Sequence, residues 1–182
     1  MYYKYVYKTP DEFSDMIMIS DGETLIELYF KGDLDEKRRE NGIGSGQCED
    51  PGYEICGEAR AEFNDVIRWL NIYFKGEEPD FKPAYKINGS TIFRNEVIAA
   101  MMTIPYGESS TYNTIAKSIA KKRGIEKMSA QAVGGAVGWN PISIIIPCHR
   151  VLGSDGSLTG YGGGIKNKAA LLKLEGNSNF RP

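Results

Sequence analysis

The residues best suited to chemistry stand together in Pro147-Cys148-His149-Arg150-Val151, directly after the apolar run 142–146, which we predict to be a buried strand. A cysteine in such a place is commonly a core thiol. A reactive thiol needs its thiolate form, which a nearby base or positive charge favours. Neighbouring side chains on a regular strand point to opposite faces, so His149 reaches Cys148 only if the chain bends or a water bridges them.

A catalytic histidine also needs an acceptor that orients its ring, and Glu175 is the candidate. It ends a short amphipathic helix in Leu171-Leu172-Lys173-Leu174-Glu175-Gly176, where spacing alone equally fits a solvated surface acid. His149 is the only histidine and the sequence has no Cys-x-x-Cys pair, so we expect no metal and no cofactor. Cys48 and Cys56 either close a loop as a disulfide or remain ordinary thiols.

Charge is unevenly distributed along the 182 residues. Residues 1–90 carry 11 basic and 19 acidic side chains, a net charge of −8, whereas residues 91–182 carry 11 basic and 5 acidic ones, a net charge of +6. A basic C-terminal half can bind phosphates while an acidic half faces away, although random variation in surface charge also produces such a difference. The sequence has no run of about 18 apolar residues and no secretory signal, which favours a cytoplasmic protein without a membrane partner.

Residues 1–80 are predicted to form a small α/β domain. The alternation of Tyr3, Tyr5 and Tyr7, and residues 24–30 after the turn Ser20-Asp21-Gly22, predict strands of an antiparallel sheet. Residues 32–53 are expected to be a loop. The apolar spacing from Phe63 to Phe74 predicts one helix that covers the sheet. The acidic stretch 76–83, with two prolines, is the predicted linker.

Residues 90–182 are predicted to form a mostly helical domain. Helical periods cover 92–103, 112–122 and 130–137, with Ser110 or Thr111 as a cap, and the polar loop 121–127 completes a helix-turn-helix pattern. The four basic residues of this loop either contact phosphates or are solvated. Gly134 and Gly135 each cost a helix about 1 kcal/mol relative to alanine. Close packing against another helix, or the approach of a DNA groove, would account for them.

Several motifs in order resemble the O6-alkylguanine-DNA alkyltransferase family over roughly residues 92–177. They are Val133-Gly134-Gly135-Ala136, Asn140-Pro141, Pro147-Cys148-His149-Arg150-Val151, Gly160-Tyr161-Gly162-Gly163-Gly164 and Leu174-Glu175-Gly176. Residues 1–80 resemble the family's variable N-terminal domain only in their element pattern. The resemblance implies an α/β N-terminal domain with a small antiparallel, ribonuclease-H-like sheet and a mostly α-helical, winged helix-turn-helix-like C-terminal domain.

The resemblance implies that Cys148 takes the alkyl group from O6-alkylguanine, and from O4-alkylthymine, in double-stranded DNA by direct displacement. His149 would be a water-mediated base oriented by Glu175, and Tyr112 would donate a proton to the flipped guanine. Asn140 would brace the turn before the site, and Tyr161 would lie in the loop over it. One monomer would repair one lesion without a cofactor. The implied DNA contacts, through a helix-turn-helix in the minor groove, come from Asn113, Ala130, Gln131, Gly134, Arg150 and Ser154.

The chain departs from the family pattern at three places. Gln131 stands where the family usually inserts an arginine into the DNA helix, and because glutamine is shorter and uncharged we predict weaker DNA affinity and less efficient flipping. An unchanged affinity and repair rate in Gln131→Arg would contradict this. Trp139 replaces a small or basic residue. Residues 121–128 are longer than the usual turn between the two helices.

Three other classes of protein fit parts of the sequence. An alkyltransferase-like protein binds the lesion without transfer, but such proteins lack the acceptor cysteine that this chain has. A Cys-His hydrolase needs an oxyanion hole and a separate histidine that faces the thiol, but the only histidine of this sequence, His149, is adjacent to Cys148. A winged-helix transcription regulator would leave the matches at His149 and Glu175 unexplained.

Overall fold

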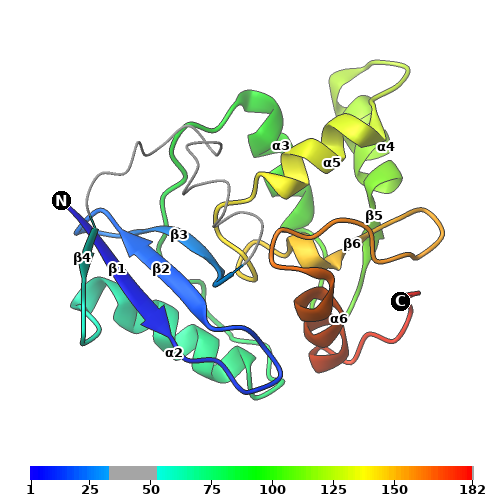
Figure 1. Ribbon diagram of the computed structural model, residues 1–182. Coiled ribbons are helices and arrows are strands. Elements are labelled where there is room, and N and C mark those ends of the chain that lie inside the picture. Colours follow the sequence, from blue (N-terminus) through cyan, green and yellow to red (C-terminus); the bar gives the residue numbers. More distant parts are fainter. Residues whose placement is uncertain (33–52, 182) are drawn as a thin grey trace. The chain divides into compact units, whose positions relative to one another are not determined.

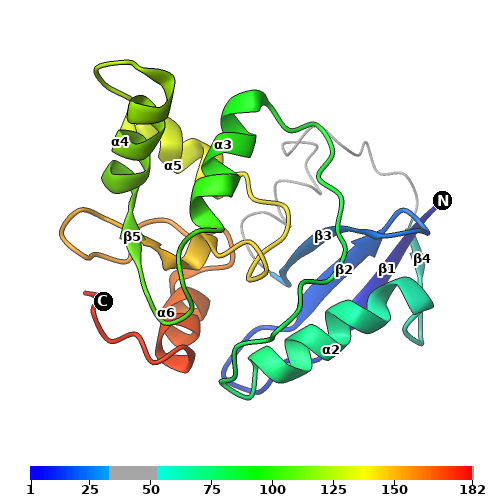
Figure 2. The ribbon, with the colours of Figure 1, turned by 180° about the vertical axis from the view of Figure 1, so that it is seen from behind.

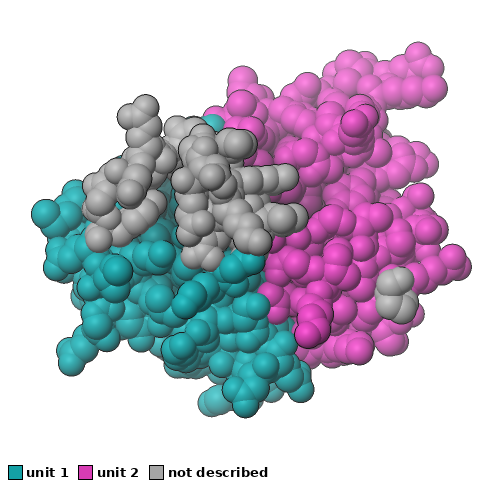
Figure 3. All heavy atoms as spheres, viewed as in Figure 1, with its two compact units in different colours: residues 1–89, 141–143 teal, residues 90–140, 144–182 magenta. Residues whose placement is uncertain are grey.

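The computed structural model describes residues 1–32 and 53–181, which form two compact units (Figures 1 and 3). Residues 1–89 and 141–143 make the first unit, and the second holds the rest of the chain from residue 90 onward. Lys86 N donates to Leu25 O at 2.8 Å, so the predicted linker 76–83 lies within the first unit. Most of the predicted loop 32–53, including Cys48, lies outside the described residues. Cys56 is a free, partly exposed thiol.

The first unit is built on a four-stranded sheet in the order β3-β2-β1-β4. β1 (Tyr2–Tyr7), β2 (Met16–Ser20) and β3 (Leu25–Phe30) pair antiparallel, whereas β4 (Tyr53–Ile55) pairs parallel with β1. The strands predicted at β1 and β3 are therefore confirmed, but the sheet is mixed rather than wholly antiparallel. All five residues of β2 are buried, so the strand lacks the polar–apolar alternation that reveals a half-buried strand in a sequence.

The predicted covering helix is present as α2 (Asn64–Tyr73), entered through the 3₁₀ turn η1 (Ala61–Phe63). Figure 2 shows α2 lying along one face of the sheet. Phe63, Val66 and Leu70 of the predicted stripe are buried, and Trp69 and Tyr73 join them in the core. The hydrophobic face of one helix therefore covers the sheet, as the spacing predicts.

Three helices at the start of the second unit confirm the helical periods. α3 (Ile92–Met101), α4 (Tyr112–Arg123) and α5 (Ala130–Gly138) pack against one another. Each is capped by a hydroxyl side chain that accepts a backbone N–H, with Thr111 rather than Ser110 capping α4. α4 continues to Arg123, so three of the four basic residues expected in a loop belong to its last turn. One of them, Arg123, forms an ion pair with Glu96 at 2.7 Å.

The segment after α5 does not form the strand predicted over residues 142–146. Ile142 makes an isolated bridge with Leu28, and Ile144 takes a φ of 70°, a left-handed conformation that is strained for a β-branched residue. All five residues are buried, which explains the strand-like sequence. The chain continues through the 3₁₀ turn η2 (Cys148–Arg150), β6 (Val151–Leu152), which pairs parallel with β5 (Ser110–Thr111), and α6 (Ile165–Leu174).

Candidate active site

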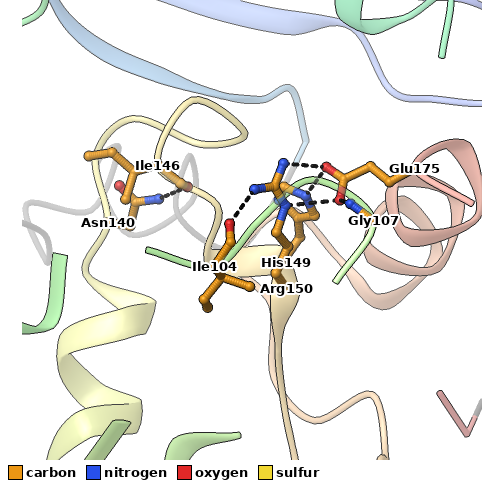
Figure 4. A network of polar contacts seen from close by, with 7 residues as sticks. All are labelled: Ile104, Gly107, Asn140, Ile146, His149, Arg150 and Glu175. Carbon is orange, nitrogen blue, oxygen red and sulfur yellow. Dashed lines mark hydrogen bonds and ion pairs between the residues drawn. The ribbon is translucent and has the colours of Figure 1, made fainter. Parts of the chain in front are cut away.

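Cys148 opens the turn η2 and is only 6% exposed. Asn140, just after α5, donates from Nδ2 to Cys148 Sγ at 3.0 Å and to the carbonyl of Ile146 at 2.9 Å; Figure 4 shows the second of these bonds. Cys148 N also donates to Ile146 O at 2.8 Å. One amide side chain therefore holds the backbone before the thiol and presents a donor to the sulfur, where it favours negative charge.

The 3₁₀ turn, rather than a strand, determines where His149 points. His149 is fully buried, and its Nε2 lies 2.8 Å from Glu175 Oε1. Because an ionised carboxylate only accepts, Nε2 carries the proton of the neutral ring and Nδ1 is the basic nitrogen. Burial lowers the pKa of His149 and outweighs the carboxylate, which raises it. The imidazole is therefore neutral at neutral pH and able to take a proton.

Glu175 is a buried carboxylate with four donors around it (Figure 4). Its Oε1 accepts from His149 Nε2 at 2.8 Å and from Arg150 Nη2 at 2.9 Å, and its Oε2 accepts from Arg150 Nε at 2.9 Å and from Gly107 N at 3.3 Å. Burial alone would raise the pKa of Glu175, but the bonds and charges of His149 and Arg150 bring it down to about 2. The surface-acid interpretation of Glu175 is therefore excluded.

Lys168 is a buried cation that sequence reasoning missed. Its Nζ donates to Val151 O at 2.7 Å and Thr159 O at 2.9 Å, and the side chain is fully buried within α6. Burial lowers the pKa of Lys168 to about 8, while the charge of Cys148 acts in the opposite direction. This coupling places a cation where it favours a Cys148 thiolate. A lysine in a short amphipathic helix is usually solvated, so no pattern in the sequence distinguishes this one.

Tyr112 is the first residue of α4, and, besides burial, the charge of Cys148 contributes to raising its pKa. Its hydroxyl donates to Thr159 O and Gly160 O, both at a long 3.4 Å. Burial raises the pKa of Tyr112, so it is a neutral phenol with a proton to donate. Tyr161 is buried in the segment between β6 and α6.

The expected DNA contacts lie mostly at the surface of the second unit. Asn113 and Gln131 are exposed near the starts of α4 and α5, Ser154 is exposed after β6, and Ala130 and Gly134 are partly exposed. Arg150 differs, because its side chain is 11% exposed and its guanidinium is bonded to Glu175 and to the carbonyl of Ile104. These surroundings do not support a DNA contact by Arg150. The guanidinium carbon of Arg94 lies over the ring of Trp139, 4.2 Å from the ring centroid.

Residues 1–32 and 53–181 contain neither a cluster of metal-binding side chains nor a membrane-spanning helix. No group of three or more His, Cys, Asp or Glu side chains there could hold a metal ion. In the same ranges, none of the helices has the length and apolar character needed to cross a membrane.

The chain is similar to known proteins over its whole length. A family model described as "6-O-methylguanine DNA methyltransferase, DNA binding domain" matches residues 92–177. The methylated-DNA–protein-cysteine methyltransferase of Haemophilus influenzae is 36% identical over all of this chain and 94% of its own length. The chain belongs to the methylated-DNA–protein-cysteine methyltransferase family.

Other members of the methylated-DNA–protein-cysteine methyltransferase family are also similar to this chain in sequence and in fold. The Mycobacterium tuberculosis protein is 49% identical over 113 residues, which is 62% of this chain and 65% of the relative, so that match spans less than two thirds of the relative's length. A crystal structure of the M. tuberculosis O6-methylguanine methyltransferase has 34% identity and a TM-score of 0.73, covering 96% of this chain and 93% of the other. Another, in complex with DNA, has 32% identity and a TM-score of 0.74, covering 98% and 94%.

These comparisons confirm the family and the fold predicted from the motifs. The family's architecture, an N-terminal mixed-sheet domain with a helical C-terminal DNA-binding domain, is that of this chain. The motif residues come from three segments of the second unit and form two hydrogen-bonded pairs, Asn140 with Cys148 and Glu175 with the neighbouring His149.

Proposed function

We propose that this protein repairs double-stranded DNA that contains O6-alkylguanine or O4-alkylthymine. It transfers the alkyl group from the damaged base to Sγ of Cys148. The observation that carries the proposal is the arrangement around the thiol. Asn140 donates to its sulfur at 3.0 Å, and the adjacent His149 is bonded to the ionised Glu175 at 2.8 Å. A buried thiol with a donor on its sulfur and an oriented neutral base beside it is suited to act as a nucleophile.

In the proposed reaction, His149 takes the thiol proton at Nδ1, directly or through one water. The thiolate then attacks the alkyl carbon, so that a C–S bond forms while the C–O6 bond breaks and its electron pair goes to the base. Tyr112 gives a proton to the departing guanine and is reprotonated from His149 through solvent. One proton leaves the thiol and one reaches the base, so the products are a neutral thioether and guanine.

The proposed reaction needs no cofactor and has no step that regenerates the thiol. Asn140 and Lys168 would stabilise the thiolate before attack. The target base must leave the duplex stack for its O6 substituent to reach a buried sulfur, which costs a few kcal/mol. Each molecule would therefore act once.

Intact-protein mass after incubation with a duplex that contains one O6-methylguanine tests the proposal. The wild type is expected to gain about 14 Da, one methylene, and to stop at one equivalent because the thiolate is consumed. Cys148→Ser should gain nothing, whereas Cys56→Ser, which removes the other described free thiol, should behave like the wild type. Tight lesion binding without a mass gain would instead indicate an alkyltransferase-like lesion-binding protein.

We also propose that the N-terminal half of α5 lies in the DNA minor groove, with Asn113 and Ser154 beside it. Its glycines support this. A Cβ on Gly135 would meet no described atom within 4 Å, and one on Gly134 would meet only ring carbons of Tyr112 at 3.8 and 3.9 Å, an ordinary contact distance. Packing within the described chain does not require glycine at either position, so close approach of a partner is the better explanation.

Gly135→Ala separates these two explanations. Gly135 lies one turn after Gln131 on the same exposed face. Without a clash inside the protein, alanine should stabilise the fold by about 1 kcal/mol. If the face contacts DNA, the same methyl group should weaken binding. Thermal unfolding and duplex affinity of the variant, measured together, check both expectations, and an unchanged affinity would contradict the proposed interface.

A further inference from the structure

Arg150 directs its guanidinium into the network beside the active site rather than toward solvent (Figure 4). Nε and Nη2 donate to the two oxygens of Glu175, both at 2.9 Å, and Nη1 donates to Ile104 O at 2.7 Å. The guanidinium is thus bonded both to Glu175, the residue that caps the C-terminus of α6, and to Ile104, which follows the end of α3. All three guanidinium nitrogens have hydrogen-bond partners inside the protein, so this side chain is poorly placed to donate to a DNA phosphate.

The forked contact fixes the rotation of the Glu175 carboxylate. A guanidinium matches both oxygens of a carboxylate in one plane, which a lysine ammonium cannot do. With Arg150 on both oxygens and Gly107 N on Oε2, the oxygen that remains directed at His149 is Oε1. Arg150 thereby determines the orientation of the acceptor that orients the histidine.

Arg150 also offsets the charge of Glu175. A buried carboxylate next to an imidazole attracts a proton onto that ring, which would make it an imidazolium before any reaction. Here the carboxylate is shared between two donors of different kinds, one permanently charged and one titratable. Glu175 therefore attracts a proton onto the His149 ring less strongly than an unshared carboxylate would.

We propose that Arg150 is a positioning residue that orients Glu175 and shares its charge, so that His149 stays neutral, with its proton on Nε2, until Cys148 ionises. This inference rests on the proposed function, because the thiol proton is what the neutral ring receives. The effects on the His149 pKa agree with the geometry: burial lowers it most, Arg150 and Lys168 also lower it, and Glu175 raises it. Among the described residues, the charged groups that act on the pKa of His149 are Glu175, Arg150 and Lys168, and the titratable Cys148 precedes it in the chain.

His149 is the only histidine of the chain, so its ring can be observed without assignment ambiguity. Long-range ¹H–¹⁵N spectra of protein labelled with ¹⁵N-histidine report the tautomer and the titration directly, without DNA. The wild type should show the Nε2–H tautomer at neutral pH. Arg150→Gln, which removes the charge and keeps hydrogen-bonding atoms, should move the titration upward in pH. Arg150→Lys, which keeps the charge, should titrate near the wild type.

Lys173→Gln is the matched control, since it removes one positive charge from the exposed last turn of α6 and should leave the titration unchanged. In single-turnover transfer, both Arg150 variants should be about ten- to a hundredfold slower, because the carboxylate is no longer held by a fork. An unchanged titration in Arg150→Gln, or an Nδ1–H tautomer in the wild type, would overturn the inference. Absence of transfer in the wild type would overturn the proposed function instead, while the spectra still decide the inference.

Discussion

Glu175→Gln is expected to slow alkyl transfer about a hundredfold or more, because general-base catalysis contributes roughly that much and the variant loses the charge that stabilises protonated His149. It should also lower the free energy of unfolding by about 3 kcal/mol or more, since breaking a buried ion pair leaves Arg150 without its counterion. The side chain is 6% exposed, so solvent cannot replace the lost partner. Single-turnover rates on the folded fraction and urea unfolding measure the two effects separately.

The same variant should lose part of the protein's acid sensitivity. The pKa of Glu175 lies at about 2 instead of its ordinary 4.5. Because the folded-state pKa is the lower one, the ionised carboxylate stabilises the fold above pH 4.5, and this contribution is lost as the pH falls through 2. The glutamine variant should lack this component of the stability profile. Glu108→Gln, an exposed carboxylate beside the same turn, is the control and should keep it. Equal acid profiles for Glu175→Gln and the wild type would contradict the ionised network.

Gly107→Ala is expected to lower both the free energy of unfolding and the rate of transfer, because the backbone N–H of Gly107 is one of the donors to Glu175. Gly107 has a φ of 76°, and a Cβ there would lie 2.8 Å from the backbone oxygen of Glu175. The left-handed conformation alone costs about 1–2 kcal/mol for alanine. The clash adds to that cost and displaces either the Gly107 N–H or the end of α6, so the rate of transfer should also fall.

Gly124→Ala provides the matched control for Gly107→Ala. Gly124 ends α4 with a φ of 65°, yet a Cβ there meets no described atom within 4 Å. It should therefore show the conformational cost alone, with transfer at the wild-type rate. Urea unfolding and single-turnover assays of both variants give the comparison. Equal destabilisation, with transfer intact in both, would mean that the contact with Glu175 has no effect.

The sequence could predict which residues gather at the candidate site, because Asn140, Cys148, His149 and Glu175 stand in short, ordered motifs and the structure joins them in two hydrogen-bonded pairs. The helices could also be predicted, since their apolar spacing and hydroxyl caps are local signals. The segment 142–146 could not: a buried irregular run and a buried strand have the same apolar composition, and only the φ of Ile144 distinguishes them.

The roles of Arg150 and Lys168 depend on tertiary contacts that no local pattern contains. The resemblance implied that Arg150 contacts DNA, yet its hydrogen-bond partners come from positions 104 and 175. Lys168 bonds to carbonyls at 151 and 159. Charged residues are rarely buried unless paired, so a sequence alone favours the exposed interpretation for both.

The return of residues 141–143 to the first unit limits how the protein can be divided. Leu28 N donates to Pro141 O and Ser143 N donates to Leu28 O, both at 2.8 Å, so these residues continue the pairing of β3. They stand in the sequence between Asn140 and the turn that carries Cys148. A gene fragment that begins at residue 90 would encode every residue assigned to the chemistry, yet it would lack the strand with which this tripeptide pairs. Residues 90–182 are therefore not expected to work when expressed alone. A shortened protein would have to keep β3 or carry a redesigned segment 141–143.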